Sequence, residues 1–151
     1  MILQNLGIYK VSTTKQAVTS FAGLPLLLGM ARSLGLEEKL NALPLKKRER
    51  GYSPAETTFT LMGLLQAGGV ALDDVSLLRG DDGMRALLGE LPAANTLGDF
   101  LRRHTATTVY RLGQIQLGAA AKVIGACGMK AVTLDIDAFF LESQKSDVEM
   151  N

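Results

Sequence analysis

The stretch Ser53-Pro-Ala-Glu-Thr-Thr-Phe-Thr-Leu-Met-Gly-Leu-Leu-Gln-Ala67 carries the clearest signal for local structure in this chain. Ser53 can cap a helix, Pro54 suits its first position, and Glu56 can complete a capping box with the serine. The pattern therefore predicts a helix from Pro54 to about Ala67, where two glycines follow. The side chains that this helix is expected to bury are Phe59, Leu61, Met62 and Leu65.

Breaker residues divide the rest of the chain up to residue 126 into further helices. Pro25 in a first turn and Gly35 after a last turn bound one helix, and Pro44 ends the next. Asn95 is the expected N-cap of a helix whose apolar face holds Leu97, Phe100 and Leu101. The expected helical ranges are 25–34, 37–43, 73–78, 83–88, 96–104 and 107–126. Weak alternation over residues 1–13 predicts an edge strand or an extended arm.

Composition narrows the class of protein. Of the 151 residues, 47% are hydrophobic and 21% charged, which excludes a disordered chain, and a net charge of +1 leaves any nucleic-acid surface to local clusters. Cys127 is the only cysteine, so we expect neither a disulfide framework nor a cysteine zinc site, and a cytoplasmic location is expected. The first residues do not resemble a signal peptide. The longest apolar stretch, residues 21–31, is too short for the ~20 residues of a membrane span, so no membrane partner is expected.

A second stretch carries candidate chemistry: Val132-Thr-Leu-Asp-Ile-Asp-Ala138. The short β-branched run from Ala131 to Ile136 predicts a buried strand, and alternation along a strand places Asp135 and Asp137 on one face. Two such carboxylates suit a hard divalent ion such as Mg²⁺, which accepts one or two carboxylates together with waters and phosphates. An exposed strand end with solvated acids is the alternative. Because a strand that delivers acids usually begins an active site, we expect the chain to be the front of a larger enzyme.

Two places could contact DNA. The connector Lys46-Lys-Arg-Glu-Arg50 contains four cations and one anion, enough to neutralise several phosphates if it faces a duplex. Solvated connectors have the same composition, so this alternative stays open. The cationic residues predicted to contact phosphates here are Lys46, Lys47, Arg48 and Arg50.

The second place, residues 84–104, has the size of a helix-turn-helix. Arg102 and Arg103 lie at the C-terminal end of its second helix, where they also complement the helix dipole. Base readout normally uses the N-terminal residues of that helix, which here are Thr96, Gly98 and Asp99, so phosphate contact by the two arginines is expected instead. A purely structural pair of helices is the alternative. His104, the only histidine, is interpreted as a helix-end residue.

Together these residues carry a resemblance. The ordered series of motifs looks like the N-terminal part of bacterial cut-and-paste insertion-sequence transposases of the DDE class, from about residue 12 to the end. The series is far more specific than any one of its members. In chain order it consists of Arg50-Gly-Tyr-Ser-Pro-Ala-Glu56, Gly68-Gly69, Leu72-Asp-Asp74, Gly89-Glu-Leu-Pro92, Thr96-Leu-Gly-Asp-Phe-Leu-Arg-Arg103 and Leu134-Asp-Ile-Asp137.

The resemblance implies two parts: a helical domain over residues 1–126 that engages transposon-end DNA, and the start of an RNase H-like catalytic domain over residues 127–151, truncated. The expected fold class is thus mainly α, followed by the first strand or strands of that α/β domain. Asp137 would be the first catalytic aspartate and a metal ligand. Family members usually carry a small residue and a threonine next, and Phe139 replaces the threonine here, so Asp135 is the alternative.

The chemistry implied is two-metal phosphoryl transfer with Mg²⁺, which also requires a second aspartate and a glutamate from distant elements. Only Glu142, Asp147 and Glu149 follow Asp137, all on the next segment, so the 151 residues are expected to be inactive alone. Unpaired strand edges would favour self-association. Two other classes stay open, a stand-alone DNA-binding regulator or inhibitor derived from a transposase and a helical protein-interaction module.

Overall fold

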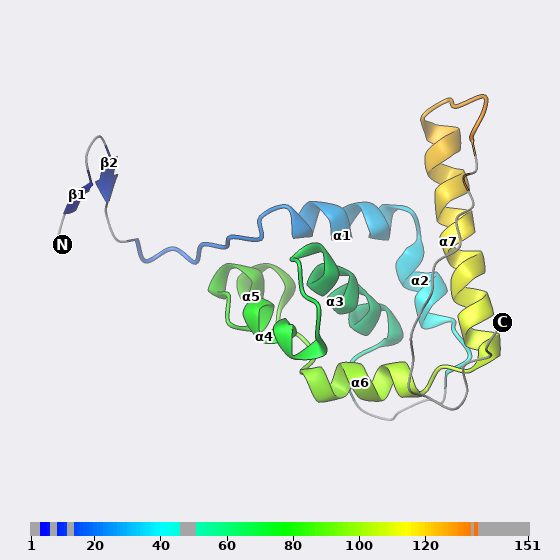
Figure 1. Cartoon of the computed structure of the whole chain (residues 1–151), viewed down its shortest axis with the longest axis horizontal. Coiled ribbons are helices and arrows are strands. Elements are labelled where there is room, and N and C mark those ends of the chain that lie inside the picture. The colour runs from blue at the N-terminus through cyan, green and yellow to red at the C-terminus, as the bar shows by residue number, and fades with distance from the viewer. Residues whose placement is uncertain (1–3, 7–8, 12–13, 46–50, 134, 136–151) are drawn as a thin grey trace.

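The computed structural model describes residues 4–6, 9–11, 14–45, 51–133 and 135, and seven α-helices make up most of that part of the chain (Figure 1). At the N-terminus, β1 (Gln4–Leu6) pairs antiparallel with β2 (Tyr9–Val11). This hairpin lies away from the helices and is joined to them by the extended chain that precedes residue 24. The mainly helical class is confirmed.

The predicted central helix is α3 (Pro54–Gln66). Its capping box forms as expected, because the Ser53 hydroxyl accepts from the Glu56 N–H at 3.1 Å and the Glu56 carboxylate accepts from the Ser53 N–H at 2.7 Å. The prediction that Leu65 is buried was wrong: it is 69% exposed, whereas Leu64 is 3% exposed. Successive helical residues differ by about 100°, so only Leu64 continues the buried side of the helix.

Two helices precede α3. Helix α1 (Leu24–Ser33) is followed by α2 (Leu36–Asn41), close to the predicted ranges. Gly35 between them has a φ of +73°, a left-handed conformation that glycine adopts without strain and that lets the chain reverse within one residue. The carbonyl of Leu34 beside this turn accepts from the ammonium of Lys122 at 2.8 Å. This bond joins the end of α1 to a helix late in the chain.

A compact turn region follows α3. It contains the 3₁₀ turn η1 (Leu72–Asp74), α4 (Val75–Arg79) and α5 (Asp82–Leu88). The Asp74 carboxylate accepts from the backbone N–H groups of Val70 and Ala71, both at 2.9 Å, and Asp81 accepts from Met84 N–H at 2.7 Å. These hydrogen bonds hold the pKa of both carboxyls below its ordinary value, because they stabilise the ionised form.

Two longer helices complete the body, α6 (Ala94–Arg102) and α7 (Ala106–Ala126). The prediction of Asn95 as N-cap was wrong. Ala93 takes that position in an extended conformation, and Asn95 lies inside the first turn, where its side chain accepts from the Thr96 N–H at 2.8 Å. The apolar face of α6 is formed by Leu97 and Phe100, 0% and 3% exposed, but not by Leu101, which is 48% exposed.

The buried side chains form two clusters that meet at α3. In the first, Phe59 of α3 and Phe100 of α6 pack together; in the second, Leu64 of α3 and Leu97 of α6 do so; Leu61 packs against both. No helix among the described residues is both long and apolar enough to cross a membrane. The first cluster consists of Leu28, Ala31, Leu40, Leu43, Leu45, Ala55, Phe59 and Phe100, and the second of Leu24, Leu64, Val75, Leu78, Met84, Leu91 and Leu97.

The expected buried strand at residues 131–136 is not formed by the residues described there. Residues 131–133 and 135 have no strand assignment and are exposed, with Val132 at 56%. A strand is stabilised by ladder hydrogen bonds to a neighbour, and no described element pairs with this segment. Residues 134 and 136–151, which include the rest of the predicted catalytic-domain start, lie outside the described part of the chain.

Two glycines give a matched test of the packing. A Cβ on Gly63 in α3 would meet Leu78 and Leu24 methyls at 3.7 and 3.8 Å, ordinary contacts, whereas a Cβ on Gly83 in α5 would lie 2.7 Å from backbone atoms of Val18 and Thr19. We expect Gly63→Ala to raise the free energy of unfolding by about 0.5–1 kcal/mol. Gly83→Ala should lower it by about 1–3 kcal/mol. Thermal and urea denaturation measure both; stabilisation by both alanines would contradict the packing of residues 18–20 on α5.

The two capping carboxylates give a second test, in acid. Because the folded-state pKa of Asp74 and of Asp81 is depressed, their contribution to stability is present above the unfolded pKa of about 3.9 and is lost as the pH falls through the folded pKa. We expect the denaturation midpoint to fall steeply below about pH 4. Asp81→Asn should destabilise the protein at neutral pH and flatten this dependence. A parallel pH profile for the variant would contradict the role of Asp81.

Candidate nucleic-acid interface

Described residues on either side of the basic connector belong to the same buried cluster. Leu45, immediately before it, and Ala55, shortly after it, belong to the first cluster and are 9% and 1% exposed. In addition, the Asn41 side chain at the end of α2 accepts from the Ala55 N–H at 3.0 Å, which ties α2 to the first turn of α3. The predicted phosphate-binding residues Lys46, Lys47, Arg48 and Arg50 themselves lie outside the described residues.

The other predicted cations lie at the C-terminal end of α6. Phe100 from that end belongs to the same buried cluster as Leu45 and Ala55, which flank the connector. Figure 1 shows the C-terminal end of α6 next to the start of α3. The described residues that flank the connector and Phe100 near Arg102 thus belong to one cluster, although more than fifty residues separate the two basic segments in the chain.

Arg102 is the more available of the two arginines. Its guanidinium donates to the Asp99 carboxylate at 2.7 Å, one helical turn earlier, and its side chain is 72% exposed. An exposed ion pair of this kind contributes only about 0–1 kcal/mol, because water and salt screen it. A phosphate group can therefore replace or share the aspartate at little cost.

Arg103 is positioned by the aromatic ring beneath it. Its guanidinium carbon lies 5.5 Å from the centroid of the Phe100 ring, a cation–π distance. The His104 ring meets the same phenyl edge to face, with centroids 4.7 Å apart, and its Nδ1 lies 3.0 Å from the Phe100 carbonyl oxygen. His104 directly follows the C-cap residue Arg103, in agreement with its interpretation as a helix-end residue.

The predicted helix-turn-helix does not have the packing of one. Helix α6 packs mainly against η1 and α3, and α5 mainly against α4, so the two helices of residues 84–104 do not form a tight pair. The first turn of α6 offers little for reading bases, since Asn95 is hydrogen-bonded within its own turn and Gly98 is buried. Contact with the sugar-phosphate backbone fits this geometry better than base readout.

The described residues form no cluster of metal-ligating side chains. Asp135 is exposed, and Asp137 lies outside the described part. No group of three or more histidine, cysteine, aspartate or glutamate side chains comes together among the residues that the structure describes. The predicted metal role of Asp135 and Asp137 therefore stays a prediction.

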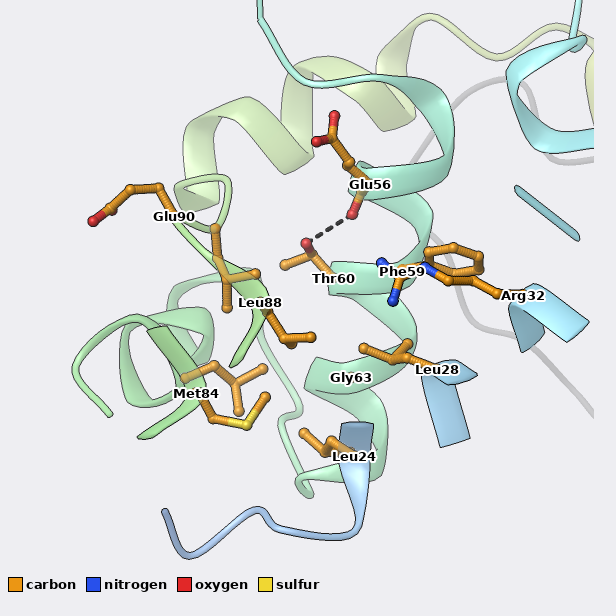
Figure 2. A pocket seen from close by; sticks show the side chains of 12 residues that line it. Leu24, Leu28, Arg32, Glu56, Phe59, Thr60, Gly63, Met84, Leu88 and Glu90 are labelled. Atoms are coloured by element: carbon orange, nitrogen blue, oxygen red, sulfur yellow. Dashed lines mark hydrogen bonds between the residues drawn. The ribbon is translucent and has the colours of Figure 1, made fainter. Parts of the chain in front are cut away.

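Sequence analysis missed a hollow at the seam between the two clusters (Figure 2). Two of its polar side chains are engaged within the protein: the Thr60 hydroxyl donates to the Glu56 carbonyl at 2.8 Å, and Arg32 lies 5.6 Å over the Phe59 ring and pairs with Glu37 at 3.1 Å. The hollow presents no nucleophile with an adjacent base. No sequence pattern could have indicated it, since its lining comes from separate elements, namely Leu24, Leu28, Arg32, Glu56, Phe59, Thr60, Gly63, Leu78, Met84, Leu88, Glu90 and Leu91.

Comparison with known proteins adds no assignment to this geometry. No family model matches the chain, and no curated protein and no solved structure is significantly similar to it.

Proposed function

We propose that this chain binds duplex DNA through the connector 46–50 and the C-terminal end of α6, and that it does so as the DNA-engaging part of a DDE-class transposase. The observation that carries the proposal is the shared cluster. Leu45 and Ala55, which flank the connector, belong to the same buried cluster as Phe100 near the end of α6, and this supports a common binding edge for the two basic segments. A duplex carries one negative charge per ~1.7 Å of axis, so several cations on one edge can meet several phosphates at once.

The chemistry of this edge supports binding without sequence reading. Arg102 is exposed and held only by a surface ion pair, and Arg103 lies over an aromatic ring. Guanidinium groups donate to phosphate oxygens in a bidentate manner, which suits backbone contact. Because α6 offers few base-reading side chains, affinity would come mainly from counterion release and depend strongly on salt.

The transposase part of the proposal rests on the ordered motifs from Arg50 to Asp137. In that reading Asp137, or Asp135 in the alternative register, is the first catalytic carboxylate, and Mg²⁺ would supply the phosphoryl-transfer chemistry in the complete enzyme. The described helices supply DNA engagement and hold none of the catalytic set. A transposase-derived regulator would use the same DNA-binding edge, so it is separated from the enzyme only by activity.

The connector is tested by salt dependence. Replacing Lys46, Lys47 and Arg48 by alanine should weaken binding to all duplex sequences similarly and lower the slope of log K against log salt by about 0.9 per lost phosphate contact. Fluorescence anisotropy with random duplexes at several salt concentrations measures this slope. An unchanged slope would remove the connector from the interface.

Arg85 in α5 provides a matched control for Arg102 at the end of α6. Arg102→Ala should weaken DNA binding, whereas Arg85→Ala should not. Both arginines form exposed ion pairs with an aspartate three residues earlier, Arg102 with Asp99 at 2.7 Å and Arg85 with Asp82 at 3.2 Å. Figure 1 shows α5, which carries Arg85, on the opposite side of α3 from the end of α6. Equal losses for the two variants would indicate a general charge effect and contradict a defined edge.

Catalysis gives a separate test. With Mg²⁺ or Mn²⁺, the 151-residue chain alone should neither nick nor join DNA, because the acids after Asp137 all lie on one adjoining segment and cannot complete a converging ligand set. In a longer enzyme with the same Leu134–Asp137 segment, Asp137→Asn should abolish cleavage and spare DNA binding. A more damaging Asp135→Asn would shift the register, and metal-dependent cleavage by the 151 residues would overturn the prediction that they lack a complete ligand set.

A further inference from the structure

The outer face of α7 is apolar and open. The opposite face holds the helix to the body, since Leu112 and Ile115 pack against the first cluster and Lys122 donates to the Leu34 carbonyl. On the outer face Tyr110 is 69% and Leu117 64% exposed. Figure 1 shows α7 at the edge of the body with α2 on one side of it. Helix α7 contacts α2 but buries only Thr108 completely.

Six residues spaced alternately by four and three form an apolar stripe along this face, called here the outer stripe. Such spacing follows one side of a helix and is the pattern of a two-stranded coiled coil. Large and small side chains alternate in it. The stripe consists of Ala106, Tyr110, Gly113, Leu117, Ala120 and Ile124.

We propose that the outer stripe is a self-association surface on which a second copy of this chain docks its own α7 in antiparallel orientation. With the helices centred on one another, each large side chain faces a small one. Reversing the order of the six residues exchanges large and small at every position, and a two-fold axis generates every layer twice, as an isologous interface requires. The facing pairs are Ala106 with Ile124, Tyr110 with Ala120, and Gly113 with Leu117.

The size pattern selects this orientation over the parallel one. In a parallel, in-register pair Tyr110 would face Tyr110 and Gly113 would face Gly113, so crowded layers would alternate with voids. In the antiparallel pair, the space above Gly113 receives Leu117 of the second copy. That space is open in the structure: a Cβ built on Gly113 meets no atom within 4 Å.

Charge does not oppose the pairing. Arg111 and Lys122 are the only charged residues of α7, and eleven residues, close to three full turns, separate them, so both lie on the side that faces the body. Lys122 is engaged there with Leu34. The residues that flank the outer stripe are uncharged, which keeps like charges out of the interface: Thr107, Val109, Gln114, Gln116, Ala121 and Val123.

The available area sets the strength of the dimer. With 21 residues, α7 is about 30 Å long. A specific interface should bury at least about 1,000 Å² in total, and a fully buried aromatic side chain supplies roughly 150–250 Å² of that. Tyr110, Leu117, Val109 and Val123 are already partly covered, at 69%, 64%, 58% and 41% exposed, so two copies of them supply no more than about this lower limit. A reversible, concentration-dependent dimer is therefore expected.

The test exchanges sizes within one layer, using sedimentation velocity of the whole chain over a concentration series. Gly113→Leu should weaken dimerisation at least about tenfold, because two leucines would then compete for one space. Leu117→Ala should also weaken it by leaving a void. The double variant Gly113→Leu/Leu117→Ala restores one large and one small residue per layer and should recover most of the affinity.

Two results would overturn the proposal. Non-specific apolar association predicts that Gly113→Leu, which adds exposed apolar surface, dimerises more tightly than the unmodified chain. A monomer at all concentrations for the unmodified chain would show that another occupant, or none, covers the outer stripe. Leu117→Glu should give a monomer, whereas the control Leu26→Glu, at a leucine of α1 that is 78% exposed, should leave the dimer intact. Helical circular dichroism of each variant checks that the fold is retained.

Discussion

The structure depends on the burial of α3 on two sides. Phe59 and Leu64 belong to different clusters, and Leu61 between them packs against both. A single helix of 13 residues thus joins the early helices α1 and α2 to the later turn region and α6. Because protein interiors are closely packed, a change in volume along α3 is transmitted to both clusters. The capping box that starts this helix therefore positions more than its own first turn.

Because α3 is buried on two sides, the polar groups that are available to ligands lie at the edge of the helical body. With both sides of α3 covered, the threonines of its buried face turn their hydroxyls back to carbonyls one turn earlier, as Thr57 does to Ser53 at 2.9 Å and Thr60 to Glu56 at 2.8 Å. No buried polar group of α3 then needs a ligand. Arg102 and Arg103 lie at the end of α6, and Phe100 beside them belongs to the same cluster as Leu45 and Ala55, which flank the 46–50 connector.

The two proposed surfaces lie on different parts of the molecule and depend on different physical interactions. The basic edge at the end of α6 depends on exposed charge and is sensitive to salt. The outer stripe of α7 is uncharged and depends on complementary sizes at apolar layers. Loss of one activity with retention of the other is therefore an informative result, since neither surface contributes side chains to the other's contacts.

Local chemistry in the sequence determined where most helices begin and end: Ser53 and Glu56 cap α3, Gly35 allows the turn before α2, and the range of α7 differed by one residue at its start. Local sequence signals gave wrong predictions at positions where the same type of side chain can occupy either of two environments. Asn95 lies within a first turn instead of capping it, and Leu65 faces solvent beside the buried Leu64. The expected strand at 131–136 needed a pairing partner that no described element supplies. Only the tertiary structure decided that Leu45, Ala55 and Phe100 enter one buried cluster and that one face of α7 stays open, because both depend on packing between residues far apart in the chain.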